Sequence, residues 1–223
     1  QDVLHHSSVI ESNENWMQQI WAFSWPFCAF GVFTWAQQIS DRWSLEFFAT
    51  TSDVGQYAVL FQLGYTPISI LTGIMMSLIG PILYQRSGSA QESSRNASVH
   101  AIAWRITQAS LALTVLSFVV TWVFHGLFFQ WLVAETFREI SFLLPWVVLA
   151  GGLFATGQML SLKLMSELRS RSLLVLKIAT AVLGVCANVL GAWLFGMEGV
   201  VGALILFSVV YLGWVVLLAK RLP

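Results

Sequence analysis

The chain has 223 residues, of which 57% are hydrophobic and 10% are charged, and its formal net charge at pH 7 is zero. An average soluble domain has about 25% charged residues, so this chain lacks the polar residues that a soluble surface needs. The balanced charge also provides no basic surface of the kind that binds nucleic acid, and we therefore expect no nucleic-acid partner.

The first stretch of the chain, residues 1–15, is polar and contains His5 and His6. We interpret it as a cytoplasmic linker that follows an upstream part of a longer protein, because the chain begins with Gln rather than Met. We expect no metal site at the two histidines.

Six long uncharged runs follow the linker, and they contain 26, 32, 29, 23, 20 and 21 residues. A helix needs roughly 20 residues to cross the hydrocarbon core of a bilayer. The runs are too long and too continuous for the strands of a membrane barrel, so helices are favoured. The sequence thus predicts an all-α membrane protein, with one bundle of six transmembrane helices over residues 16–220. The predicted spans are 17–40, 56–84, 106–133, 140–162, 173–196 and 199–219.

The positions of Lys and Arg predict the orientation of these spans. Nine of them fall in the second and fourth connections, at the start of the fifth span and in the C-terminal tail, which share one side of the membrane. The other side has only Arg42 and Arg138. Because cytoplasmic loops are enriched in positive charge, both termini are expected in the cytoplasm, with the bundle in a plasma membrane.

The first two predicted spans each have a polar face. Gln38 lies on such a face in the first span, and Gln62 and Tyr65 lie on one in the second. We interpret both faces as lining a water-filled cavity. At the outer end of the first span, Asp41 and Arg42 form either an interfacial ion pair or a gate contact. The hydroxyls of the third span are better explained by tight helix packing.

The fifth predicted span has a stripe that includes Lys177, Thr180, Gly184, Asn188 and Gly191. Residues at these spacings share one face of a helix, within about 60° of one another. A lysine in a span is costly unless its ammonium reaches the headgroups, pairs or meets water. Two interpretations stay open: Lys177 extends to the headgroups, or it faces a hydrated cavity together with Asn188.

The sequence lacks the common motifs of catalytic, metal-binding and phosphate-binding sites. It contains no nucleophile–base–acid set, no HExxH zinc spacing and no phosphate-binding glycine loop, so we expect neither an enzyme nor a bound cofactor or metal. Cys28 and Cys186 both lie in apolar runs and are interpreted as small core residues. The middle of every predicted span also lacks Asp and Glu, so a carboxylate that couples transport to an ion is expected elsewhere.

Several short motifs resemble those of bacterial polysaccharide-transporter flippases. The first span and its exit are similar to the seventh span of that family, and the next segment to the entry of its eighth span. Asn188 and the glycine-rich segment after it resemble the last helical pair. The motifs, in order, are Trp25-Pro26, Gln37-Gln38-Ile39-Ser40-Asp41-Arg42, Asp53-Val54-Gly55-Gln56-Tyr57, Pro81, Asn188 and Gly199-Val200-Val201-Gly202-Ala203.

The resemblance implies a flippase for O-antigen and related lipid-linked oligosaccharides. This family shares a superfamily with multidrug extruders and lipid II flippases, whose members have two six-helix bundles around a central cavity. The chain is then the second bundle, and its partner is the N-terminal six-helix bundle. The implied substrate is an undecaprenyl-diphosphate-linked repeat unit, which crosses the bacterial inner membrane for surface polysaccharide synthesis, with the lipid tail among the membrane lipids.

The resemblance also implies roles for particular residues. Lys177 and Arg105 attract the diphosphate or acidic sugars, and Pro26 and Pro67 are bend points for alternating access. The sugar hydroxyls bind to Gln38, Gln62, Tyr65 and Asn188.

Three other functions stay open. A multidrug extruder of the same superfamily would favour an acidic, aromatic cavity, and this half has no buried carboxylate in its predicted spans. A non-transporting scaffold for glycan-assembly enzymes would need no aligned polar faces. A membrane glycosyltransferase or ligase would need polar loops with clustered carboxylates or arginines, and the outer loops here are short.

Overall fold

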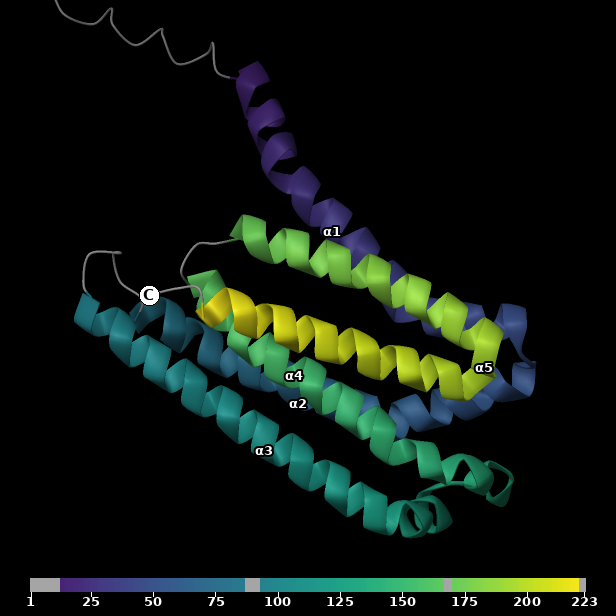
Figure 1. Cartoon of the computed structure of the whole chain (residues 1–223). Coiled ribbons are helices and arrows are strands. Elements are labelled where there is room, and N and C mark those ends of the chain that lie inside the picture. The colour runs from purple at the N-terminus through teal and green to yellow at the C-terminus, as the bar shows by residue number, and fades with distance from the viewer. Residues whose placement is uncertain (1–12, 87–92, 167–169, 221–223) are drawn as a thin grey trace, which may run out of the picture.

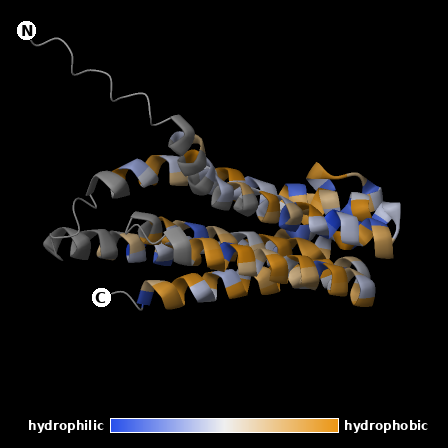
Figure 2. Cartoon of the chain, turned by 90° about the horizontal axis from the view of Figure 1, so that it is seen from above, coloured by the Kyte–Doolittle hydropathy of each residue, from blue (hydrophilic) through white to orange (hydrophobic). Residues whose placement is uncertain are grey.

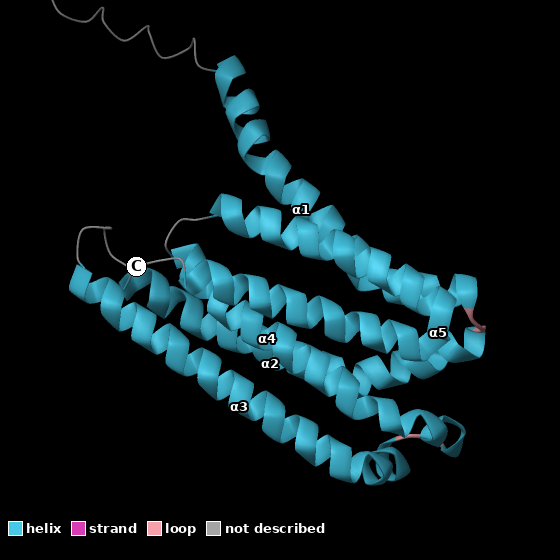
Figure 3. Cartoon of the chain, viewed as in Figure 1, coloured by secondary structure: helices cyan, strands magenta, loops and turns pink. Residues whose placement is uncertain are grey.

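The computed structural model describes residues 13–86, 93–166 and 170–220, which form helices joined by short connections (Figure 3). For these residues the prediction of an all-helical chain is confirmed. Most of the predicted linker, residues 1–12, lies outside the described residues, and its last three residues belong to the first helix. The helices in chain order are α1 (Asn13–Phe48), α2 (Thr51–Arg86), α3 (Ser93–Leu132), the 3₁₀ helix η1 (Glu135–Leu143), α4 (Leu144–Ser166) and α5 (Ser170–Lys220).

Successive long helices run in opposite directions (Figure 1). The turn from α1 to α2 is fixed by a reciprocal cap between Thr50 and Asp53. The Thr50 backbone N–H donates to the Asp53 carboxylate at 2.9 Å, and the Asp53 backbone N–H donates to the Thr50 hydroxyl at 3.3 Å. This arrangement satisfies donors that the start of a helix otherwise leaves unpaired. The first turns of α1, drawn in purple, lead away from the other helices.

Helix α5 is a hairpin of two arms rather than one rod. Gly196 has φ 58° and ψ −133°, a conformation that is essentially restricted to glycine, and the chain doubles back there (Figure 1). The arms approach most closely at Gly191 and Gly199. A Cβ atom on either glycine would collide with the backbone of the other. We call residues 170–195 the first arm and residues 197–220 the return arm.

Four helical segments within the described residues are long and apolar enough to cross a membrane. They are Thr51–Ile82, Ala103–Leu132, Glu135–Leu162 and Leu173–Lys220, and the last includes both arms of α5. Figure 2 shows hydrophobic colours along most of the return arm, which leads to the C-terminus. These segments indicate a membrane-embedded protein.

Helix α4 is the centre of the bundle and packs against α2, α3 and α5. In the most apolar window of Glu135–Leu162, 67% of the residues are buried, against 6% in that of Ala103–Leu132. Glycines allow the close contacts: Gly151 faces Tyr65, Gly152 faces Thr114 and Gly157 faces Tyr211. Small residues permit this approach because membrane helices associate through packing rather than through exclusion of water.

Candidate functional site

A small polar pocket lies inside the bundle, between α1, α4 and both arms of α5. Its volume is about 40 Å³. A water molecule occupies about 30 Å³ in the liquid, so the pocket holds one or two waters and is too small for a sugar. The polar side chains that line it are Thr34 and Gln37 of α1, Gln158 of α4, and Lys177, Thr180 and Tyr211 of α5.

Helix packing places these groups around the pocket. Lys177 and Thr180 lie about one turn apart on the first arm, and the Thr180 hydroxyl donates to the Leu176 carbonyl at 2.8 Å. From the return arm, the Tyr211 hydroxyl donates to Gln158 Oε1 at 3.2 Å. Gly157 makes this bond possible, since a Cβ there would lie only 2.7 Å from the Tyr211 ring.

A second polar cluster, the interhelical network, joins the end of α1 to α2 and α5. It consists of Ser40, Asp41, Tyr57 and Asn188. The Tyr57 hydroxyl donates to Asp41 Oδ2 at 2.8 Å, and Asn188 Nδ2 donates to the Ser40 hydroxyl at 2.8 Å. The backbone N–H of Arg42 donates to the other carboxylate oxygen of Asp41 at 2.7 Å. The adjacent residues Ser40 and Asp41 therefore form hydrogen bonds from α1 to two different helices, α5 and α2.

An aromatic ladder connects the network to the pocket. The Arg42 guanidinium carbon lies 5.9 Å from the centroid of the Phe61 ring, and Phe61 stacks on Tyr65 with centroids 4.6 Å apart. Tyr65 then lies 6.4 Å from Phe154, and Phe154 lies 4.9 Å from Tyr211. These separations are typical of cation–π and aromatic pairs. A continuous chain of ring contacts thus links the end of α1 to Phe154 and Tyr211, which line the pocket.

The two residues singled out in the fifth span occupy different environments. Lys177 lines the polar pocket. Asn188 lies roughly 16 Å further along the helix, where it is 3% exposed and bonds to Ser40 across the contact between α1 and α5. Gly184, on the same stripe, packs against Gln37 and Phe207. The stripe therefore meets α1 and the return arm along much of its length.

The other candidate cavity residues lie outside the pocket. Gln38, Gln62 and Arg105 are exposed, and Gln62 Oε1 accepts a bond from the Thr66 hydroxyl at 3.4 Å. Tyr65 belongs to the aromatic ladder described above.

The gate and hinge candidates lie in α1 and α2. Asp41 is 4% exposed in the interhelical network, whereas Arg42 is exposed and lies over Phe61. Pro26 and Pro67 lie within α1 and α2, each of which is continuous through its proline.

Three polar residues of the pocket were not site candidates from the sequence: Gln37, Gln158 and Tyr211. Gln37 adjoins Gln38, and the two side chains point about 100° apart on a helix, so a small rotation decides which one faces inward. Gln158 did carry a signal, because it is an amide within the predicted fourth span, four residues before its end.

The pH dependence of stability tests the burial of Asp41, which lies just beyond the predicted first span. Burial raises the pKa of the Asp41 carboxyl above its ordinary value, and the bonds from Tyr57 and from the Arg42 backbone lower it by less. The folded protein then binds this proton more tightly than the unfolded chain does. The resulting stability is full below about pH 4 and is lost as the pH rises through the raised pKa.

We therefore expect the unfolding temperature of the wild type to fall relative to that of Asp41→Asn as the pH rises from about 4 to about 8. Thermal unfolding in detergent at a series of pH values measures this difference. A difference that stays constant with pH would contradict the burial of a titrating carboxyl.

Comparison of the chain with protein-family models, with curated proteins and with solved structures finds no match in any of the three.

Proposed function

We propose that this chain is one six-span bundle of a transporter that moves undecaprenyl-diphosphate-linked oligosaccharides across the bacterial plasma membrane. The observation that supports it is the position of Lys177, a cation that lines a polar pocket inside an apolar helix bundle. Ionisable residues at such positions usually serve a transport pathway, because burying them in lipid is costly.

The six spans of this proposal lie within α1, α2, α3, α4 and the two arms of α5. The hairpin at Gly196 returns the chain to the side on which α5 begins (Figure 1). With the orientation predicted from Lys and Arg, both termini are cytoplasmic and Lys177 lies toward the cytoplasmic end of its arm.

The small pocket corresponds to an occluded state of the transporter. Gln37 of α1 forms one wall, so a movement of α1 away from α4 and α5 widens the pocket. The Lys177 ammonium can then attract the diphosphate, and the amides of Gln37 and Gln158 can bind sugar hydroxyls. Ser40 and Asp41 lie about one turn from Gln37 and hold α1 in the closed position.

Replacement of Lys177 tests this mechanism. Lys177→Ala in the chromosomal gene is expected to lower export of the repeat unit about tenfold, since a hydrogen bond to a charged group contributes about 1.5–3 kcal/mol. Surface polysaccharide and the lipid-linked intermediate that accumulates inside the cell are measured together.

Lys177→Arg, which keeps the charge, should retain more export than Lys177→Ala. Lys220→Ala is the matched control, because Lys220 is an exposed lysine at the end of the same helix. Normal export by Lys177→Ala at a normal protein level would remove Lys177 from the mechanism.

One observation favours a second candidate, the non-transporting scaffold for glycan assembly. Gly184 and Asn188 are sealed between helices, as expected for spans that only pack. The reactivity of a cysteine placed in the pocket distinguishes the two functions. The variant is Thr34→Cys, with Cys28 and Cys186 replaced by Ser so that no other thiol reacts. A transporter should expose this position to a hydrophilic thiol reagent while substrate is supplied, whereas a scaffold should leave it unreactive.

A further inference from the structure

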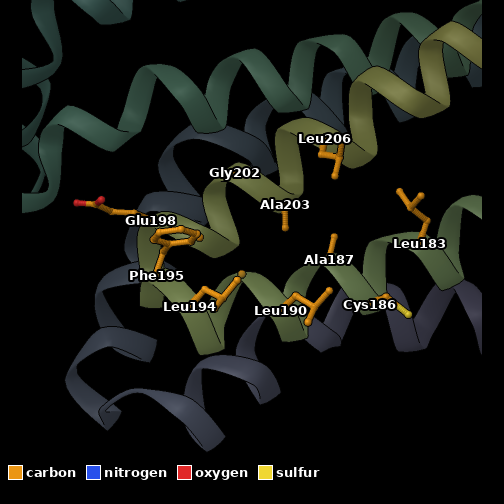
Figure 4. A pocket seen from close by; sticks show the side chains of 12 residues that line it. Leu183, Cys186, Ala187, Leu190, Leu194, Phe195, Glu198, Gly202, Ala203 and Leu206 are labelled. Atoms are coloured by element: carbon orange, nitrogen blue, oxygen red, sulfur yellow. The ribbon is translucent and has the colours of Figure 1, made fainter.

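A large apolar groove runs along the face of α5 between its two arms (Figure 4). Its volume is about 700 Å³. Alanines and glycines, including Ala187, Gly202 and Ala203, form its floor, and leucines such as Leu183, Leu190 and Leu206 form its walls. Figure 4 shows Ala187 and Ala203 pointing toward each other across the gap between the arms.

Apart from Glu198, the residues that line the groove are apolar. Both arms belong to Leu173–Lys220, a segment that is long and apolar enough to cross a membrane. A molecule that fills this groove within a membrane must present an apolar surface to it. The volume lies within the range of about 300–1,000 Å³ that is typical of ligand sites.

One charge stands at the end of the groove, at the tip of the hairpin. Glu198 lines the groove and is exposed. Its side chain extends beyond the groove, away from the floor (Figure 4). A carboxylate in this position repels a headgroup whose net charge is negative and attracts an ammonium group.

We propose that this groove binds an acyl chain of a phospholipid whose headgroup carries a primary ammonium, such as phosphatidylethanolamine, with the ammonium at Glu198. The chain lies on the alanine and glycine floor, between the leucine walls. The site is independent of the pocket at Lys177 and of the proposed transport function.

Native mass spectrometry tests the proposal on the protein purified from its host and held in mixed micelles. The micelles contain equal amounts of phosphatidylethanolamine and phosphatidylglycerol. We expect the wild type to retain phosphatidylethanolamine in preference. Glu198→Gln should reduce this preference about two- to fivefold, which is the effect of one exposed charge contact.

The groove itself is tested by filling it. Gly202→Phe puts a ring into the groove, and because a Cβ at this position meets no atom within 4 Å, the fold should tolerate it. We expect this variant to lose the retained lipid. Gly213→Phe is the matched control: Gly213 lies on the same arm, about three turns away, and its Cβ also meets nothing within 4 Å.

Three outcomes would overturn the proposal. The wild type could retain both lipids equally, or Gly202→Phe and Gly213→Phe could retain the same amount of lipid. The third is a wild-type dimer that Gly202→Phe converts to a monomer, which would assign the groove to a second copy of the chain.

Discussion

Gly191→Ala is expected to destabilise the protein by about 3 kcal/mol or more, or to abolish the recovery of folded protein. The new Cβ would collide with the carbonyl of Gly199 on the return arm. The position of a Cβ is fixed by its backbone and the carbonyl is itself backbone, so no change of side-chain rotamer relieves the collision. The two arms must separate, and the contacts of the hairpin with α1 and α4 are then disturbed as well.

Gly202→Ala is the matched control, since Gly202 lies three residues from Gly199 on the same arm and its Cβ would meet no atom within 4 Å. Replacing glycine by alanine within a helix generally gains a little stability, up to about 1 kcal/mol, so this variant should unfold at or above the wild-type temperature. Thermal unfolding and the yield of monodisperse protein in detergent compare the two variants. Equal unfolding temperatures would show that the arms are not in backbone contact.

The second large effect is expected at Asp41. Asp41→Ala leaves the hydroxyl of Tyr57, a side chain with 0% exposure, without its acceptor. A buried donor that loses its partner costs about 1–3 kcal/mol. The same change removes the side-chain bond between the end of α1 and α2, and it leaves the Ser40–Asn188 bond to α5 in place.

A double-mutant cycle separates the bond from other effects of the substitution. Tyr57→Phe removes the donor as well, so Asp41→Ala with Tyr57→Phe should cost less than the sum of the two single variants, by about 1 kcal/mol or more. Asp41→Asn keeps an acceptor and should be milder than Asp41→Ala. Additive losses in the cycle would mean that the two side chains do not interact.

The all-helical class could be predicted from the sequence, because long uncharged runs indicate helices, but α1 and α3 extend beyond their runs to include charged residues such as Asp41 and Arg105. The end of the predicted fifth span, residue 196, coincides with the non-helical Gly196. The fourth predicted span began at residue 140, whereas α4 begins at Leu144 after the nine-residue 3₁₀ helix η1. Pro145, in the first turn of α4, explains the start of the regular helix, since proline is tolerated there.

The environment of each polar face could not be predicted in the same way. The stripe with Gly184 and Asn188 was identified correctly as one face of a helix, but spacing does not say whether such a face meets water or another helix. Here it meets Gln37 and Ser40 of α1. Asp41 illustrates the same limit, because its burial depends on Tyr57, which is 16 residues away and reaches it only through the turn at Thr50.

The central place of α4 has a consequence for how the chain is made. α4 leaves the ribosome before either arm of α5, yet its Gln158 bonds to Tyr211 of the return arm. The Tyr211 ring also lies directly against Gly157 of α4. This contact between α4 and the return arm can therefore form only after residue 211 has been synthesised.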